Sequence, residues 1–94
     1  MNDLKKRARA RFSGTVQGVG FRFKTIHLAR GFLVCGYVKN LANGQVEVAL
    51  EGRKSEIERF LSAIQLSSLE PYIRDVEIEW QEWQGEFSTF EIGY

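Results

Sequence analysis

Polar and apolar residues alternate near the start of the chain and again near its end. In an extended conformation, residues 7–13 direct three arginines to one face and three apolar residues to the other: Arg7, Arg9 and Arg11 against Ala8, Ala10 and Phe12. Residues 75–81 repeat the pattern, with Val76, Ile78 and Trp80 on the apolar side. Both stretches predict strands with one buried face, and the second pattern places Trp80 in the core.

Two other stretches have the spacing of amphipathic helices. Within residues 21–32, Ile26, Ala29 and Phe32 fall on one helical stripe, which predicts a first helix. The second stretch has apolar residues at i, i+3, i+4 and i+7: Ile57, Phe60, Leu61 and Ile64. Ser55 precedes this stripe and is the predicted N-cap of the second helix.

A hairpin is predicted between the two helices. Residues 34–40 are rich in β-forming side chains, and residues 45–51 alternate between polar and apolar. Asn43 and Gly44 separate the two stretches, and an Asn-Gly pair is a strong signal for a hairpin turn. Near the end of the chain, residues 87–94 predict a short return strand.

The order of these elements is typical of one α+β architecture. Strand, helix, strand, strand, helix and strand predict a ferredoxin-like split βαβ sandwich over a single domain, residues 1–94. Its antiparallel sheet carries both helices on one face, with the first strand between the third and the fourth. The arginine face would then lie beside the carboxylates of both neighbouring strands: Glu47, Glu51, Glu77 and Glu79.

Composition and charge exclude several classes of function. The 94 residues are 44% apolar and 27% charged, and the net charge is +1, so no global field recruits nucleic acid or an anionic membrane. The charged start of the chain and the lack of eighteen consecutive apolar residues predict a cytoplasmic protein that does not span a membrane. Cys35 is the only cysteine, which excludes an intramolecular disulfide and predicts a small buried residue.

The stretch with candidate chemistry lies where the first strand ends and the first helix begins. Residues 15–22 read Thr-Val-Gln-Gly-Val-Gly-Phe-Arg. Gly18 and Gly20 can adopt positive φ, which lets successive N–H groups converge on an anion at the positive end of a helix dipole. Arg22 would bind two phosphate oxygens through its planar guanidinium. By itself this stretch is equally compatible with a simple chain reversal followed by a solvated arginine.

A second motif favours an anion-binding loop over a simple chain reversal. Residues 36–40 read Gly-Tyr-Val-Lys-Asn and end the strand before the hairpin turn. Together with residues 14–22, Ala29, residues 43–46 and residues 51–52, this motif resembles the acylphosphatase family over nearly the whole chain. The resemblance implies metal-independent hydrolysis of a carboxylic–phosphoric anhydride to a carboxylate and inorganic phosphate, without a cofactor.

The resemblance also implies roles for individual residues. Arg22 matches the catalytic arginine that binds phosphate, and Asn40 matches the asparagine that positions the attacking water. The expected phosphate-binding residues form one continuous segment: Val16, Gln17, Gly18, Val19, Gly20, Phe21 and Arg22. Leu33 and Leu41 depart from the common pattern, which has a glycine at the helix end and a threonine after the asparagine. Neither departure touches the loop, so activity is expected to persist.

Two other functions share this expected fold. A nucleic-acid-binding module would stack bases on aromatic side chains of the open sheet face, but that face is predicted to carry paired Arg and Glu. A binding or carbamoyl-transfer module within a larger assembly would hold phosphate without rapid turnover. The absence of an appended domain favours a free-standing enzyme, and the paired surface charges favour a monomer with a small-molecule acyl phosphate as substrate.

Overall fold

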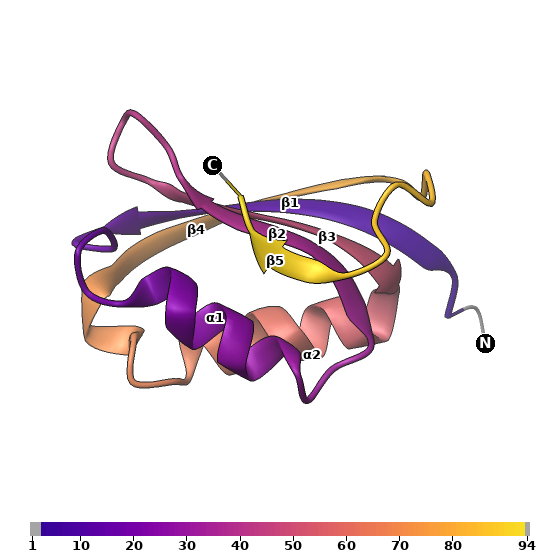
Figure 1. Cartoon of the computed structure of the whole chain (residues 1–94), viewed down its shortest axis with the longest axis horizontal. Coiled ribbons are helices and arrows are strands. Elements are labelled where there is room, and N and C mark those ends of the chain that lie inside the picture. Colours follow the sequence, from indigo (N-terminus) through magenta and orange to yellow (C-terminus); the bar gives the residue numbers. More distant parts are fainter. Residues whose placement is uncertain (1–2, 94) are drawn as a thin grey trace.

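A computed structural model of the chain describes residues 3–93. It has a twisted sheet with both helices packed against one face (Figure 1). The elements in chain order are β1 (Lys5–Gly14), α1 (Phe21–Ala29), β2 (Val34–Asn40), β3 (Val46–Arg53), α2 (Lys54–Gln65), a 3₁₀ turn η1 (Glu70–Tyr72), β4 (Ile73–Glu82) and β5 (Phe90–Ile92). The predicted ferredoxin-like element order is therefore confirmed.

The strands are ordered β4-β1-β3-β2-β5. As predicted, β1 lies between β3 and β4, and these neighbours run antiparallel. The sheet differs from the predicted antiparallel sheet at one edge, because β5 pairs in parallel with β2. The chain does reverse after β4, but β5 joins the opposite edge of the sheet, where β2 already runs in the direction opposite to β4.

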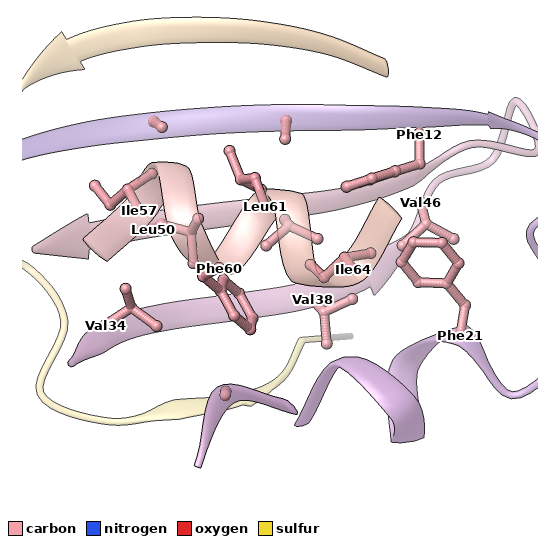
Figure 2. Packing of buried hydrophobic residues seen from close by; sticks show 14 of the residues in the cluster. Phe12, Phe21, Val34, Val38, Val46, Leu50, Ile57, Phe60, Leu61 and Ile64 are labelled. Atoms are coloured by element: carbon pink, nitrogen blue, oxygen red, sulfur yellow. The ribbon is translucent and has the colours of Figure 1, made fainter. Parts of the chain in front are cut away.

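The core fills the space between the sheet and the helices, as Figure 2 shows. The predicted stripe of α2 is fully confirmed, since all four of its apolar side chains are buried: Ile57, Phe60, Leu61 and Ile64. Burial of each such side chain contributes roughly 2 kcal/mol relative to exposure. At the other end of the core, the rings of Phe12 and Phe21 lie 5.0 Å apart and join the start of α1 to β1.

The ends of both helices differ from the prediction. Helix α1 ends at Ala29, and Arg30 keeps a right-handed conformation, so the following Leu33 needs no positive φ. Helix α2 begins at Lys54, which places the predicted cap, Ser55, inside its first turn. The carboxylate of Asp3 takes the capping role: it accepts hydrogen bonds from the Ser55 amide at 3.1 Å and the Ser55 hydroxyl at 2.8 Å.

Three residues predicted to be buried are not: Ile78, which is 40% exposed, Trp80 and Cys35. Trp80 is 39% exposed, because β4 is an edge strand and the two helices cover the other strands instead. Its ring lies against the Lys54 ammonium, 5.4 Å from the ring centroid. Cys35 is half-buried rather than buried, because it lies on the sheet face that carries no helix.

The sheet face without helices carries the predicted lattice of opposite charges. Arg11 lies 3.5 Å from Glu47 and 3.5 Å from Glu77, and Arg7 lies 3.6 Å from Glu51. The pairs differ in environment, because Arg7 and Glu51 are nearly inaccessible whereas Glu77 is exposed. A buried carboxylate needs full hydrogen bonding to offset its desolvation.

Glu51 meets that need by holding the segment between β4 and β5. Its carboxylate accepts hydrogen bonds from the backbone N–H groups of Gln84, Glu86 and Phe87 at 2.8, 2.7 and 3.2 Å. Burial acts to raise the pKa of Glu51, but these three donors and Arg7 outweigh it and hold the pKa below the usual value. The segment that leads to β5 therefore depends on an ionised Glu51.

We expect Glu51→Gln to lower the free energy of unfolding by about 3 kcal/mol at pH 7, because an amide cannot accept all of these bonds. A carboxylate with a lowered folded-state pKa stabilises the protein above its unfolded pKa of about 4.3, and this contribution is lost as pH falls through the folded value. Urea unfolding at pH 7 and pH 3 measures both effects, and the loss caused by the substitution should shrink at the lower pH.

The matched control for this prediction is Glu77→Gln. Glu77 also pairs with an arginine of β1, but its side chain is 73% exposed, so its removal is expected to cost less than about 1 kcal/mol. Equal losses in the two variants would contradict an anchoring role for Glu51.

Candidate functional site

The loop between β1 and α1 has the backbone that its glycines predict. Gly18 has φ 78° and Gly20 has φ 80°, both left-handed. A Cβ built at either position would meet no atom within 4 Å, so the requirement for glycine here is conformational. The left-handed Gly20 immediately precedes α1 and turns the chain into the helix.

This loop presents a run of free amide donors. Within residues 3–93, none of the backbone N–H groups of residues 16–23 has a protein acceptor, and the first N–H of the region that does is that of Lys24, bonded to the Gly20 carbonyl at 3.0 Å. The amides of residues 21–23 are the open N–H groups of a helix start, where the macrodipole is positive. No acidic residue lies in the first turn of α1. The loop therefore favours an anion.

A hollow of about 200 Å³ lies beside these donors. Its lining comes from the loop, the start of α1 and the end of β2: Val16, Gly18, Gly20, Phe21, Arg22, Phe23 and Asn40. Larger hollows exist elsewhere, and the one at the start of β4, for example, places the carboxylates of Glu70 and Asp75 beside Arg74, so its charges are mixed. The hollow beside the loop combines free donors with a cation.

Arg22 lies in the first turn of α1, one residue after the buried Phe21. Phe21 packs on Phe12 and fixes the helix start against β1. The Arg22 side chain is half-buried and forms no ion pair with any Asp or Glu among residues 3–93. Its guanidinium thus keeps its donors available for an anion in the hollow.

Asn40 reaches the same hollow from a different strand. In the sheet register, Val46 of β3 pairs with Phe12 of β1 on one side and with Asn40 of β2 on the other. Because neighbouring strands lie about 4.8 Å apart, Asn40 and the end of β1 are separated by only about 10 Å. Asn40 is exposed, and no protein partner bonds its carboxamide within the described residues.

The structure does not bring every predicted residue to the hollow. Five of the seven phosphate-loop residues line it, but Gln17 and Val19 do not. The Gln17 side chain instead bonds the backbone of the hairpin. Phe23, which the sequence reasoning passed over, lines the hollow although its side chain is 71% exposed. Phe23 could have been noticed in the sequence as a large apolar residue that lies off the buried stripe of α1.

The histidine of α1 and the carboxylates of β4 are not assembled into a site. His27 is exposed on α1. Glu77 and Glu79 are exposed on β4, with both carboxylates within 4 Å of the Arg11 guanidinium. Across residues 3–93, His, Cys, Asp and Glu side chains form no group of three that could hold a metal ion. Neither helix in that range has the length and apolar character needed to cross a membrane.

Comparisons with known proteins agree with the geometry. The sequence profile of the family named Acylphosphatase matches residues 8–92. An acylphosphatase of Archaeoglobus fulgidus is 39% identical over 87% of this chain and 91% of its own length. One from Dehalococcoides mccartyi is 41% identical over 89% of this chain and 93% of its own length. The crystal structure of acylphosphatase from Bacillus subtilis superposes with a TM-score of 0.86 at 29% identity, covering 95% of this chain and 99% of the other.

Proposed function

The chain belongs to the acylphosphatase family, and from this membership we propose that Arg22, Asn40 and the loop amides carry out its reaction. The enzyme hydrolyses small-molecule acyl phosphates, which gives a carboxylate and inorganic phosphate. The single observation that supports this site is the hollow shared by Arg22, Asn40 and the donors of residues 16–23.

Binding of the phosphoryl group is the first task of the site. The free amides of the loop and the Arg22 guanidinium would donate to the nonbridging oxygens, whose charge has to be stabilised as the bond to the carboxylate breaks. The leaving group needs little help, because a carboxylate is the conjugate base of an acid with a pKa near 4. Catalysis then depends mainly on position and electrostatics.

Water attack is the second task. The Asn40 carboxamide would hold one water in line with the departing carboxylate. The water oxygen forms a bond to phosphorus while the bond from phosphorus to the carboxylate oxygen breaks. An amide is a poor base, so the proton of the water passes to an oxygen of the bound phosphoryl group, and the products are a free carboxylate and inorganic phosphate.

The reaction is proposed to need no metal ion. We expect wild-type protein to hydrolyse benzoyl phosphate with the same kcat/KM in EDTA and in Mg²⁺. A phosphate monoester such as p-nitrophenyl phosphate should react at least about a thousandfold more slowly, because its phenolate leaving group is a much stronger base. Inorganic phosphate should inhibit competitively. Loss of activity in EDTA with recovery in Mg²⁺ would contradict the proposal.

We also propose that the enzyme is a cytoplasmic monomer that does not bind nucleic acid. We place it in the cytoplasm, in line with its single unpaired cysteine. A monomer is favoured by the charges along the free strand β4, where a second copy would bring Glu77 and Glu79 against like charges. Nucleic acid is not an expected partner, because the arginines on the open sheet face are paired with carboxylates.

A further inference from the structure

The side chain of Gln17 joins the phosphate loop to the hairpin that follows Asn40. Its amide nitrogen donates to the backbone carbonyl of Leu41 at 2.8 Å and to that of Gln45 at 2.9 Å. These two residues form the base of the hairpin loop, closed by a hydrogen bond from the Leu41 amide to the Gln45 carbonyl at 2.8 Å. One side chain therefore uses both of its N–H donors on the residues that bound the hairpin loop.

A second bond on the same side supports this connection. The Gln45 side chain donates to the Ser13 hydroxyl at 2.9 Å, which ties the hairpin base to the end of β1. The Gln45 side chain is itself held by Asn43, whose amide donates to it at 2.9 Å. The hairpin base is thus attached to the segment that carries the anion-binding loop at two points, Ser13 and Gln17.

The Asn40 side chain has no bond to the protein within residues 3–93 that could hold it in place. Its position is set by the backbone on its two sides, namely the pairing with Val46 and the adjacent Leu41. Gln17 holds the carbonyl of Leu41, one residue from Asn40. A misplacement of about 1 Å in a group that orients a reactant can cost about a hundredfold in rate.

We propose that Gln17 is a positioning residue whose carboxamide sets the placement of Asn40 relative to the phosphate loop. The inference rests on the proposed roles of Arg22 and Asn40. It also explains why the Gln17 side chain turns away from the hollow although the residue lies within the loop. Its contribution reaches the reaction through the water held by Asn40, whereas phosphate binding is left to Arg22 and the loop amides.

Gln17→Met tests the proposal, because methionine has a similar length and shape but no donor. We expect kcat for benzoyl phosphate to fall by about ten- to a hundredfold, with KM and the Ki of inorganic phosphate changing by less than about twofold. A residue that only supported the phosphate loop would change KM and Ki instead. Gln17→Ser, which removes the same donors with a smaller side chain, provides a second variant if the first folds poorly.

A double-mutant cycle with Asn40→Ala gives the sharper readout. Asn40→Ala should lower kcat by about a hundredfold or more, and adding Gln17→Met should lower it no further, because the group being positioned is gone. Gln65→Met is the matched control: its amide bonds the Leu61 carbonyl on α2, away from the site. It should leave kcat unchanged.

The outcomes distinguish the positioning role of Gln17 from the proposed function of Asn40. If Asn40→Ala lowers kcat and Gln17→Met lowers it by its full factor again in that background, the positioning role is overturned while the proposed function stands. A rise in KM and Ki after Gln17→Met at unchanged kcat would also overturn it. If Asn40→Ala leaves kcat unchanged, the proposed function of Asn40 fails and this inference fails with it.

Discussion

Replacing Arg22 with glutamine lowers kcat for benzoyl phosphate by about a thousandfold, the expected cost of removing a bidentate cationic donor from a phosphoryl-transfer site. The same variant binds inorganic phosphate more weakly, because the loop amides alone then hold the anion. Steady-state kinetics with phosphate as inhibitor measure both effects. The fold should persist, since the Arg22 side chain forms no ion pair within the described residues.

Two further variants separate charge from geometry. Arg22→Lys keeps the positive charge but loses the planar guanidinium. Compared with Arg22→Gln, it should therefore restore more of the phosphate affinity than of kcat. Arg30→Gln removes an exposed arginine at the far end of the same helix and should change neither parameter. Retention of wild-type kcat by a folded Arg22→Gln variant would contradict the proposed site.

Replacing Gly36 with alanine is expected to have the largest effect on folding. Gly36 has φ 152°, and a Cβ there would lie 1.8 Å from the carbonyl oxygen of Ala49 in the paired strand β3. Its N–H also bonds the Thr89 carbonyl at 2.8 Å, beside the first pair of β2 with β5. The backbone of Gly36 or of β3 must shift to admit a methyl group, and a shift of Gly36 would also disturb its bond to Thr89, at an expected total cost of about 4 kcal/mol or more.

Such a loss is a large part of the total stability of a domain of this size, about 5–15 kcal/mol. Urea unfolding should show a much lower midpoint or no folded baseline. Gly31→Ala is the matched control, because a Cβ at Gly31 would lie 3.6 Å from the Leu28 carbonyl, an ordinary contact. An unchanged midpoint for Gly36→Ala would show that β2 and β3 can separate without penalty.

Short sequence patterns predicted the elements that form from residues close together in the chain. The apolar stripe of α2 and the turn signal at Asn43 and Gly44 each lie within a few residues, and both elements are present. Helix ends were less predictable because their partners are distant in sequence. Ser55 has the composition of a cap, yet Asp3, fifty-two residues earlier, bonds the first turn of α2.

Burial on the sheet was predictable only where the sheet is covered. Alternation identified the inner face of β4 correctly, but it does not reveal that β4 is an edge strand beyond the cover of the helices. Trp80 therefore came out 39% exposed. Alternation likewise could not predict that β5 runs parallel to β2, since this depends on which edge of the sheet the last strand joins.

In the candidate site, too, some features could be predicted from the sequence and others only from the tertiary structure. The sequence by itself determined the glycine loop, the placement of Arg22 in the first helical turn and the presence of Asn40 at a strand end, because each follows from residues close together in the chain. Only the tertiary structure decided that Asn40 lies beside the loop, that Gln17 bonds the hairpin and that Glu51 holds the segment before β5. These contacts depend on strand order and register, which are set by packing between segments far apart in sequence.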